Sequence, residues 1–204
     1  CIGVAPTGEV FAGVDQIGSL GKGGGKGKII RLLDADNDGI SEAHTVYAVI
    51  DNPRGIVPVG DKLYVLHTKW GEGKKFEGMF LSVLTDANGD GKADKVEDVI
   101  VMKTTGVYPH NGLSGLCFDP RGNLVFGLGE NLGHPYTMIG RDGVTIKGAK
   151  GIGGGVFRCT ARGDMLEQLA RGFWNPFGMC VDPWGRIFAV DNDPGSSPPC
   201  RLLH

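Results

Sequence analysis

Long apolar runs and blocks of one charge are both absent from this sequence. No segment approaches the roughly 20 apolar residues that a membrane-spanning helix needs. The formal net charge is -2, and the basic residues form no block beyond a glycine-diluted run at 22–28. The sequence therefore gives no electrostatic footprint for nucleic acid or for an anionic membrane. We expect neither nucleic-acid binding nor a membrane span in this segment.

Several common catalytic and targeting motifs are missing as well. The sequence shows no Gly-rich phosphate loop, no Ser-His-Asp order and no Cys-x-x-Cys spacing. Its five cysteines cannot all pair with one another, because their number is odd. The chain opens on strand-like residues without the charged region of a signal peptide, so we expect any signal peptide to be absent from this segment.

Glycine and proline are abundant, at 36 and 11 residues, and they are spread along the whole chain. This composition favours many short elements joined by tight turns. A unit of apolar strand, tight turn and apolar strand occurs four times, with successive turns 53 to 63 residues apart. The four copies are IGVAPTGEVFAGVD from Ile2, GIVPVGDKLYVLHT from Gly55, GLCFDPRGNLVFGLGE from Gly115 and GMCVDPWGRIFAVDND from Gly178.

A second hairpin lies between successive copies of this unit. Its strand pairs read KIIRLLD with AHTVYAV, MFLSVLTD with KVEDVIVM, and VFRCT with MLEQLAR. Two hairpins per repeat make a four-stranded antiparallel unit, which at this period is typical of a β-propeller blade with loop insertions. An all-β sandwich is the alternative fold.

The repeat divides the chain into about three and a half blades of a single, partial propeller domain, 1–204. Because a propeller closes into a ring, we expect the native polypeptide to extend beyond this segment. The blades are predicted at about 1–50, 51–103 and 104–171, with an incomplete one at 172–204.

The outer hairpin of the second repeat carries a loop with the oxygen pattern of a calcium-binding EF-hand loop. Side-chain or main-chain oxygens fall at loop positions 1, 3, 5, 7, 9 and 12, with glycine at 6. So many carboxylates in twelve residues repel one another unless a hard cation neutralises them. The predicted ligands are Asp86, Asn88, Asp90, Lys92 (through its carbonyl), Asp94 and Glu97.

The first repeat carries a shorter version of the same pattern, which we expect to be the weaker site because position 12 is Thr45. An Asp/Gly-rich turn that binds no metal is the alternative for both loops. Strands flank the loops, so Ca²⁺ would stabilise a hairpin, with an affinity suited to extracellular calcium. This favours a periplasmic or secreted protein. The predicted ligands of the first loop are Asp34, Asp36, Asp38, Ile40 (through its carbonyl) and Glu42.

The remaining loops are expected to meet at the opposite end, the mouth of the propeller, where rigid scaffolds usually carry their sites. His110 precedes an inner strand and is the candidate general base, because imidazole titrates near neutrality. His67 is expected to end a strand and to project similarly. A hydrogen-bonded anchoring role is the alternative for each histidine. The predicted mouth residues are 15–16, 51–54, 67–70, 108–111, 130–134, 174–175 and 191–193.

Two segments, HNGLSGLCFDPRGNLVFGLGEN and ARGFWNPFGMCVDPWGRIFAVDND, carry a family resemblance. The chain resembles, over nearly its whole length, the soluble glucose dehydrogenase and sorbosone dehydrogenase family. It is also similar to the propellers of large exported bacterial proteins described as membrane-bound dehydrogenase-like, which often continue into helical-repeat and c-type haem domains. The resemblance implies a six-bladed propeller.

The resemblance also implies a cofactor, pyrroloquinoline quinone, in the central mouth. In the family a histidine takes the substrate hydroxyl proton while hydride passes to the quinone, and His110 matches that histidine. An Arg-Asn pair contacts the cofactor in the family; here Asn175 matches the asparagine and Trp174 stands in place of the arginine. A family glutamine near the first blade corresponds to Gln16.

These observations predict a calcium-stabilised propeller domain of an exported, dehydrogenase-like protein that oxidises sugars or other alcohols. The first alternative is a binding module without a redox cofactor, whose mouth holds a glycan or a partner protein. The second alternative is a structural spacer between other domains. Fold alone does not decide between these functions.

Overall fold

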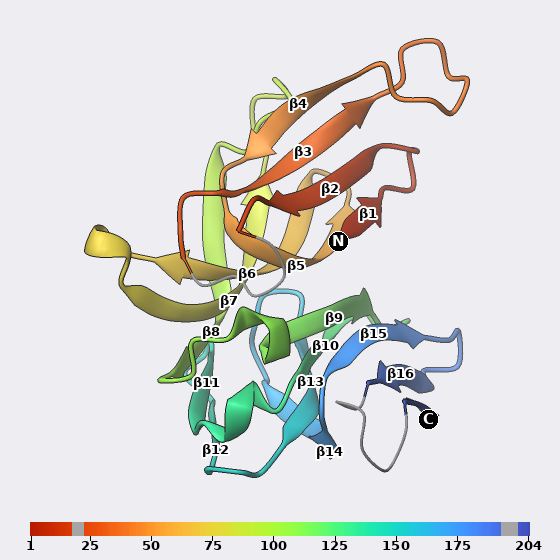
Figure 1. Cartoon of the computed structure of the whole chain (residues 1–204). Coiled ribbons are helices and arrows are strands. Elements are labelled where there is room, and N and C mark those ends of the chain that lie inside the picture. The colour runs from red at the N-terminus through yellow and green to blue at the C-terminus, as the bar shows by residue number, and fades with distance from the viewer. Residues whose placement is uncertain (18–22, 193–199) are drawn as a thin grey trace.

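The computed structural model describes residues 1–17, 23–192 and 200–204 of the chain. In these residues the protein is all-β, and its only helical segments are single 3₁₀ turns. The strands form four antiparallel blades arranged as a β-propeller, which confirms the predicted fold class (Figure 1). No helix in the described residues is long and apolar enough to cross a membrane.

Blades 1 and 2 each contain four sequential strands, with the first strand innermost. Long apolar segments dominate blade 2, because both of its faces are covered by neighbouring blades. Blade 1 consists of β1 (Ile2–Val4), β2 (Val10–Asp15), β3 (Gly27–Leu33) and β4 (Ala43–Ala48). Blade 2 consists of β5 (Asp51–Val59), β6 (Lys62–Trp70), β7 (Phe76–Thr85) and β8 (Lys95–Thr104), with the turn η1 (Glu72–Lys74) between β6 and β7.

Blade 3 is interrupted by a hairpin that joins the neighbouring blade. The hairpin follows β10, and its first strand pairs with β8, so that it extends the outer edge of blade 2 to a six-stranded sheet. Blade 3 consists of β9 (Leu113–Phe118), β10 (Asn123–Leu128), β13 (Gly154–Thr160) and β14 (Glu167–Phe173), and the inserted hairpin of β11 (Tyr136–Gly140) and β12 (Thr145–Gly148). The turn η2 (Pro109–Asn111) precedes β9, and η3 (Asn131–Gly133) follows β10.

Blade 4 contains three strands in the described residues, β15 (Pro176–Val181), β16 (Ile187–Asp191) and β17 (Arg201–Leu203). Its innermost strand, β15, lies beside β9 of blade 3. The four innermost strands, β1, β5, β9 and β15, therefore follow one another around the propeller axis.

The hydrophobic core lies between the blades. Consecutive residues of β6 point to opposite faces of blade 2, so that Leu63 and Val65 pack toward blade 1 while Tyr64 and Leu66 pack toward blade 3. A smaller apolar cluster joins blades 3 and 4. This radial packing fixes how the blades sit around the axis.

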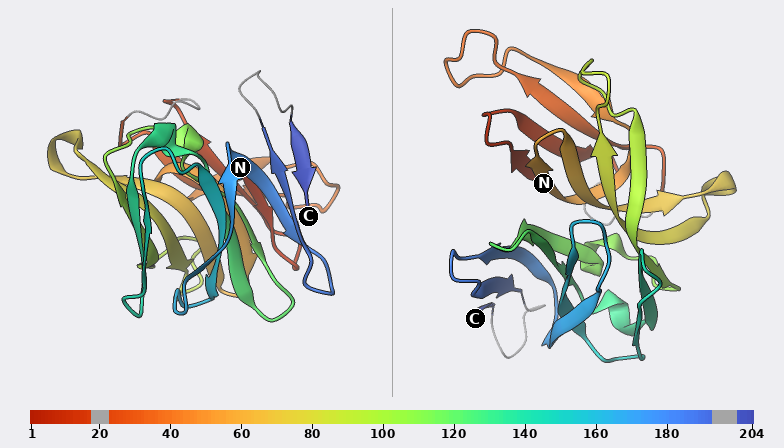
Figure 2. Two further views of the ribbon diagram at one scale, coloured as in Figure 1. Left: turned by 90° about the horizontal axis from the view of Figure 1, so that it is seen from below. Right: turned by 180° about the vertical axis from the view of Figure 1, so that it is seen from behind.

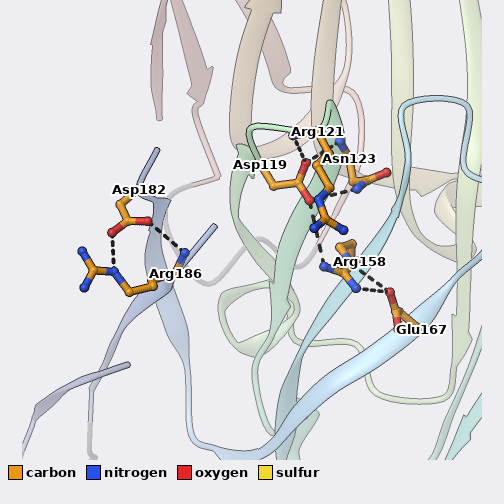
Figure 3. A network of polar contacts seen from close by, with 7 residues as sticks. All are labelled: Asp119, Arg121, Asn123, Arg158, Glu167, Asp182 and Arg186. Atoms are coloured by element: carbon orange, nitrogen blue, oxygen red, sulfur yellow. Dashed lines mark hydrogen bonds and ion pairs between the residues drawn. The ribbon is translucent and has the colours of Figure 1, made fainter. Parts of the chain in front are cut away.

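The two ends of the propeller differ in their loops. The turns within the hairpins lie at one end, and the 3₁₀ turns η2 and η3 lie at the other end, the mouth (Figure 2, left). At the hairpin end, Asp119 and Asp182 each accept main-chain N–H bonds from their own Asp-Pro-x-Gly turn, and Asp182 also binds the Arg186 side chain (Figure 3). Arg158 joins the first of these turns to Glu167 on β14. This end is built from structural turns and the two acidic loops.

Candidate functional site at the propeller mouth

Each innermost strand of blades 2, 3 and 4 carries a β-bulge close to the mouth. In β5 the residues 52–54 are all placed opposite His67, and in β9 and β15 the extra residues are Gly115 and Phe177. Bulges redirect side chains and are common beside functional sites. In blade 2 the bulge contains the Asn-Pro pair at 52–53, and in blade 4 it follows the Asn-Pro pair at 175–176.

His110 lies in the turn η2, just before β9. Its ring centroid lies 5.6 Å from that of Tyr108 and 5.9 Å from that of Phe177, which extends from the bulge of blade 4. The Nδ1 atom is buried and has no hydrogen-bond partner. Burial lowers the pKa of His110, and the charge of Arg54 lowers it further. Both effects favour the neutral imidazole, which is the form a general base needs.

A buried asparagine lies at or just before the start of the innermost strand of blades 2, 3 and 4, but the three differ in their bonding. Asn52 Nδ2 donates to Asp15 Oδ2 at 2.8 Å, and Asn111 Nδ2 donates to Glu130 Oε1 at 3.2 Å. Asn175 is 1% exposed, and neither its Oδ1 nor its Nδ2 has a partner. An unpaired buried amide costs roughly 1–3 kcal/mol per group, so this position calls for a functional explanation.

Unpaired buried polar atoms are concentrated at the mouth. In the described part of the chain they belong to four side chains, and three of these, His110, Asn131 and Asn175, lie in the loops around blades 3 and 4. Arg31 Nε is the fourth and lies in blade 1. Such a concentration distinguishes the mouth from the rest of the molecule.

A cavity of about 490 Å³ opens at the mouth between blades 3 and 4. It combines an aromatic surface from the half-buried Trp174 with the carboxylates of Glu130 and Asp191 and the guanidinium of Arg201. Asp191 accepts bonds from the main-chain N–H groups of Trp174 and Asn175 and thereby holds this loop. Gly151, Ile152, Gly153 and Gly172 also line it. We call this the Trp174 pocket.

The Trp174 pocket adjoins the His110 region. Glu130 links the two, because its main-chain N–H donates to Trp174 O at 2.7 Å and its side chain accepts from Asn111, the residue after His110. His110 itself does not line the pocket. Gln16 is exposed at the end of β2 and is not among the pocket residues, and Asp193 lies outside the described residues.

The residues of the Trp174 pocket do not fit the implied quinone cofactor. That cofactor carries carboxylates and needs cations, whereas the lining offers two carboxylates and one cation. The cation, Arg201, is already paired, with its Nη2 3.2 Å from Asp191 Oδ2. The residue before Asn175 is an uncharged tryptophan, which cannot replace the charge or the bidentate hydrogen bonding of an arginine.

The expectation that His67 ends a strand at the mouth is wrong. His67 lies inside β6 and is 2% exposed, with its Nδ1 2.9 Å from Thr68 O and its Nε2 2.7 Å from Ser82 Oγ. Burial lowers its pKa to about 4. The strand continues to Trp70 because β7 pairs with it along its whole length, and this pairing turns His67 into the blade.

The first acidic loop brings its carboxylates together. One oxygen from each of Asp34, Asp36, Asp38 and Glu42 lies within 4.8 Å of the others. The loop is preorganised, because Asp34 accepts bonds from the N–H groups of residues 38 and 39, and Asp38 from that of Ile40. Clustered carboxylates are the donor set that Ca²⁺ prefers.

The second acidic loop has the same main-chain bonding but a different charge distribution. Asp86 accepts from the N–H groups of residues 89 to 91, and Asp90 from that of Lys92. The Asn88 amide donates to Asp94 Oδ1 at 3.1 Å, and among the described residues no metal-type group includes these carboxylates. Glu97 lies on β8 and pairs with Lys95 and Arg141. The carboxylates thus converge in the first loop, whereas in the second loop Asp94 is bonded to an amide and Glu97 to cations.

Comparison with solved structures places the fold in a recognisable class. A structure described as "glucose dehydrogenase" matches 95% of this chain and 63% of its own, at 18% identity and a TM-score of 0.53. Another, "Crystal structure of glucose dehydrogenase", matches 89% and 57% at 17% identity and a TM-score of 0.49. The chain is thus a propeller of the fold seen in glucose dehydrogenase, and it spans about three fifths of those chains' length.

The sequence family is established by a match over residues 7–199. The chain belongs to the family described as "Domain of unknown function (DUF7133)". No curated protein matches the chain.

Three mouth residues received no role from the sequence, namely Arg54, Glu130 and Arg201. Arg54 carries a readable signal, because Asn-Pro-Arg-Gly at 52–55 aligns with Asn-Pro-Phe-Gly at 175–178. That alignment places Arg54 and Phe177 at equivalent bulges of two blades. Glu130 and Arg201 have no such signal, since their roles depend on contacts between blades.

Proposed function

We propose that this propeller domain binds a sugar or another polyhydroxylated alcohol at its mouth. The observation that carries the proposal is the cluster of unpaired buried polar atoms beside a pocket of suitable size and chemistry. Ligand pockets combine apolar walls with a few convergent polar groups. Trp174 offers an apolar face for a sugar ring, and Glu130, Asp191 and Arg201 offer acceptors and donors for hydroxyl groups.

The binding proposal is tested by calorimetric titration with a panel of mono- and disaccharides. Replacing Trp174 by alanine removes the stacking surface and is expected to weaken binding at least about tenfold, or about 1.4 kcal/mol. The matched control is Trp184→Ala, since Trp184 is 79% exposed on a turn at the hairpin end. Equal affinity in wild type and Trp174→Ala would contradict the pocket assignment.

Dehydrogenation is the second candidate function, and the neutral imidazole of His110 favours it. The structures described as glucose dehydrogenase share the fold, and His110 would accept the proton of a bound hydroxyl. A hydride acceptor is also required, and the pocket does not fit the quinone. Dye reduction on the same sugars, with pyrroloquinoline quinone and calcium added, tests this function. Turnover that is lost in His110→Ala would establish it, and a wild type without turnover leaves the domain a binding module.

We further propose that Ca²⁺ binds the loop 34–42 and, more weakly, the loop 86–97. In the first loop four carboxylates converge without a cation among them, whereas in the second the Asn88 amide already bonds Asp94. An affinity in the extracellular range, about 10⁻⁴ to 10⁻³ M, suits an exported protein. An exported domain of a larger dehydrogenase-like protein is thus part of the proposal.

Calcium is expected to raise the melting temperature of the wild type. At a concentration of about 100 times Kd it adds about 2.7 kcal/mol to the free energy of unfolding. A matched exchange at the third loop position tests the ranking of the loops: Asp36→Asn gives the first loop the asparagine of the second, and Asn88→Asp gives the second loop the aspartate of the first. Asp36→Asn should reduce the calcium-dependent shift, and Asn88→Asp should increase it. A melting temperature that does not respond to calcium in any of the three proteins would refute the proposal.

A further inference from the structure

A second cavity adjoins the Trp174 pocket at the mouth. It has a volume of about 310 Å³ and shares three lining residues with the pocket, Asp191, Asn192 and Arg201. In the described residues, those that line this cavity and not the pocket are Phe177, Val190 and Cys200. We call it the Phe177 cavity. Because the two cavities have a wall in common, they are neighbouring parts of one groove along blade 4.

The bulge of β15 presents Phe177 to the second cavity. Pro176 pairs with Asp191 and Gly178 with Val190, so Phe177 is the extra residue that leaves the ladder. Its side chain is 42% exposed, and the neighbouring Val190 is 48% exposed. A bulge redirects its side chain, and here it leaves a phenyl ring and a valine together in one cavity. The second cavity therefore has an apolar wall of its own.

Asp191 holds the two aromatic residues in a fixed relation. It accepts a hydrogen bond from the main-chain N–H of Trp174 at 3.1 Å and pairs with Pro176, the residue before Phe177. Trp174 and Phe177 are three residues apart, so their Cα atoms are at most about 11 Å from each other. Two linked sugar rings extend over a comparable length. The groove thus offers one aromatic side chain for each of two neighbouring rings.

Polar groups lie where the two cavities meet. Asn192 is exposed there. In the described residues Arg201 donates only through Nη2, to Gly172 O at 3.1 Å and to Asp191 Oδ2 at 3.2 Å. A guanidinium has five N–H donors, so with two in use three remain for the oxygens of a ligand. Aromatic walls with polar groups between them match a chain of sugar rings, whose hydroxyl groups need hydrogen bonds.

We propose that the groove binds an oligosaccharide, with one sugar unit on Trp174 and the next unit on Phe177. The proposal rests on the proposed sugar-binding function and extends it from one unit to two. Phe177 acts here as a specificity-determining residue, because it contacts only the second unit. Arg201 and Asn192 contact the oxygens near the glycosidic bond.

The test is calorimetric titration of glucose and of maltose, cellobiose and laminaribiose into wild type, Phe177→Ala and Phe177→Tyr. At least one disaccharide should bind the wild type about tenfold or more tightly than glucose does, because it contacts both aromatic residues. Phe177→Ala should remove most of this preference and leave the affinity for glucose unchanged. Phe177→Tyr keeps the ring and should keep the preference. The control is Trp184→Ala, since Trp184 is 79% exposed on a turn at the hairpin end.

Three results would overturn the second sugar unit alone. The first is a wild type that binds glucose and all three disaccharides equally. The second is a disaccharide preference that survives in Phe177→Ala, which would place the second ring elsewhere. The third is an equal loss of glucose and disaccharide affinity in Phe177→Ala, which would assign Phe177 to a site for one unit. If no sugar binds the wild type, the proposed function itself fails.

Discussion

Replacing Phe126 by alanine is expected to lower the free energy of unfolding by about 3–5 kcal/mol. Phe126 is fully buried in β10, and its ring stacks on Phe157 of β13, with the ring centroids 5.7 Å apart. It belongs to the core cluster that joins blades 2 and 3. Removing the ring leaves a cavity between two blades that their strands cannot close, since each blade is held by its own ladders.

The measurement is urea unfolding followed by far-ultraviolet circular dichroism. The matched control is Phe177→Ala, which removes the same group from a side chain that is 42% exposed at the mouth. The control should lose less than about 1 kcal/mol. Equal losses in the two variants would contradict the assignment of the core to the space between the blades.

Acid is expected to destabilise the protein through His67. The pKa of this histidine is lowered to about 4, chiefly by burial, from a reference value of 6.5. Because the folded state disfavours the protonated form, the stabilising contribution is complete above pH 6.5 and is lost as the pH falls toward 4. At about 1.4 kcal/mol per pH unit the total is about 3 kcal/mol.

The His67→Gln variant isolates this contribution. Glutamine is neutral at every pH and offers donors and acceptors for Thr68 O and Ser82 Oγ, the two present partners. Its stability at neutral pH should be lower than that of the wild type, but the slope between pH 6.5 and 4 should be reduced. Chemical unfolding at a series of pH values measures both. Parallel losses in the two proteins would show that other groups cause the acid sensitivity.

The fold could be predicted from the sequence because the pattern of strand, tight turn and strand occurs four times. Turn glycines such as Gly8 and Gly122 have φ of 94° and 80°, values that glycine adopts without strain, so they mark the hairpins reliably. Alternating apolar residues then specify which faces are buried. The inserted hairpin of β11 and β12 was not predicted, because its short strands pair with a blade other than the one that contains them in sequence.

The site was only partly readable. The predicted strand order places residues 108–111, 130–134 and 174–175 at one end of the propeller. Successive strands run in opposite directions, so the loops at each end follow once the turns are identified. The strand order did not reveal that Asn52 and Asn111 are paired while Asn175 is not, or that Glu130 bridges His110's neighbour and Trp174. Such differences depend on contacts between blades. The ranking of the acidic loops stays a prediction, and the loop pattern did not reveal the bond from Asn88 to Asp94 or the partners of Glu97.

The central claim is that distant blades assemble one ligand site at the mouth, and the three tryptophan indoles provide a direct test. Trp174 lines the pocket, Trp70 bonds Asn52 and Thr68 in blade 2, and Trp184 lies on a turn at the hairpin end. In ¹H–¹⁵N spectra, titration with a bound sugar should shift the Trp174 indole resonance together with the imidazole of His110, and leave that of Trp184 unchanged. A ligand that shifts the indole resonance of Trp184 and leaves the resonances of Trp174 and His110 unchanged would contradict the assignment.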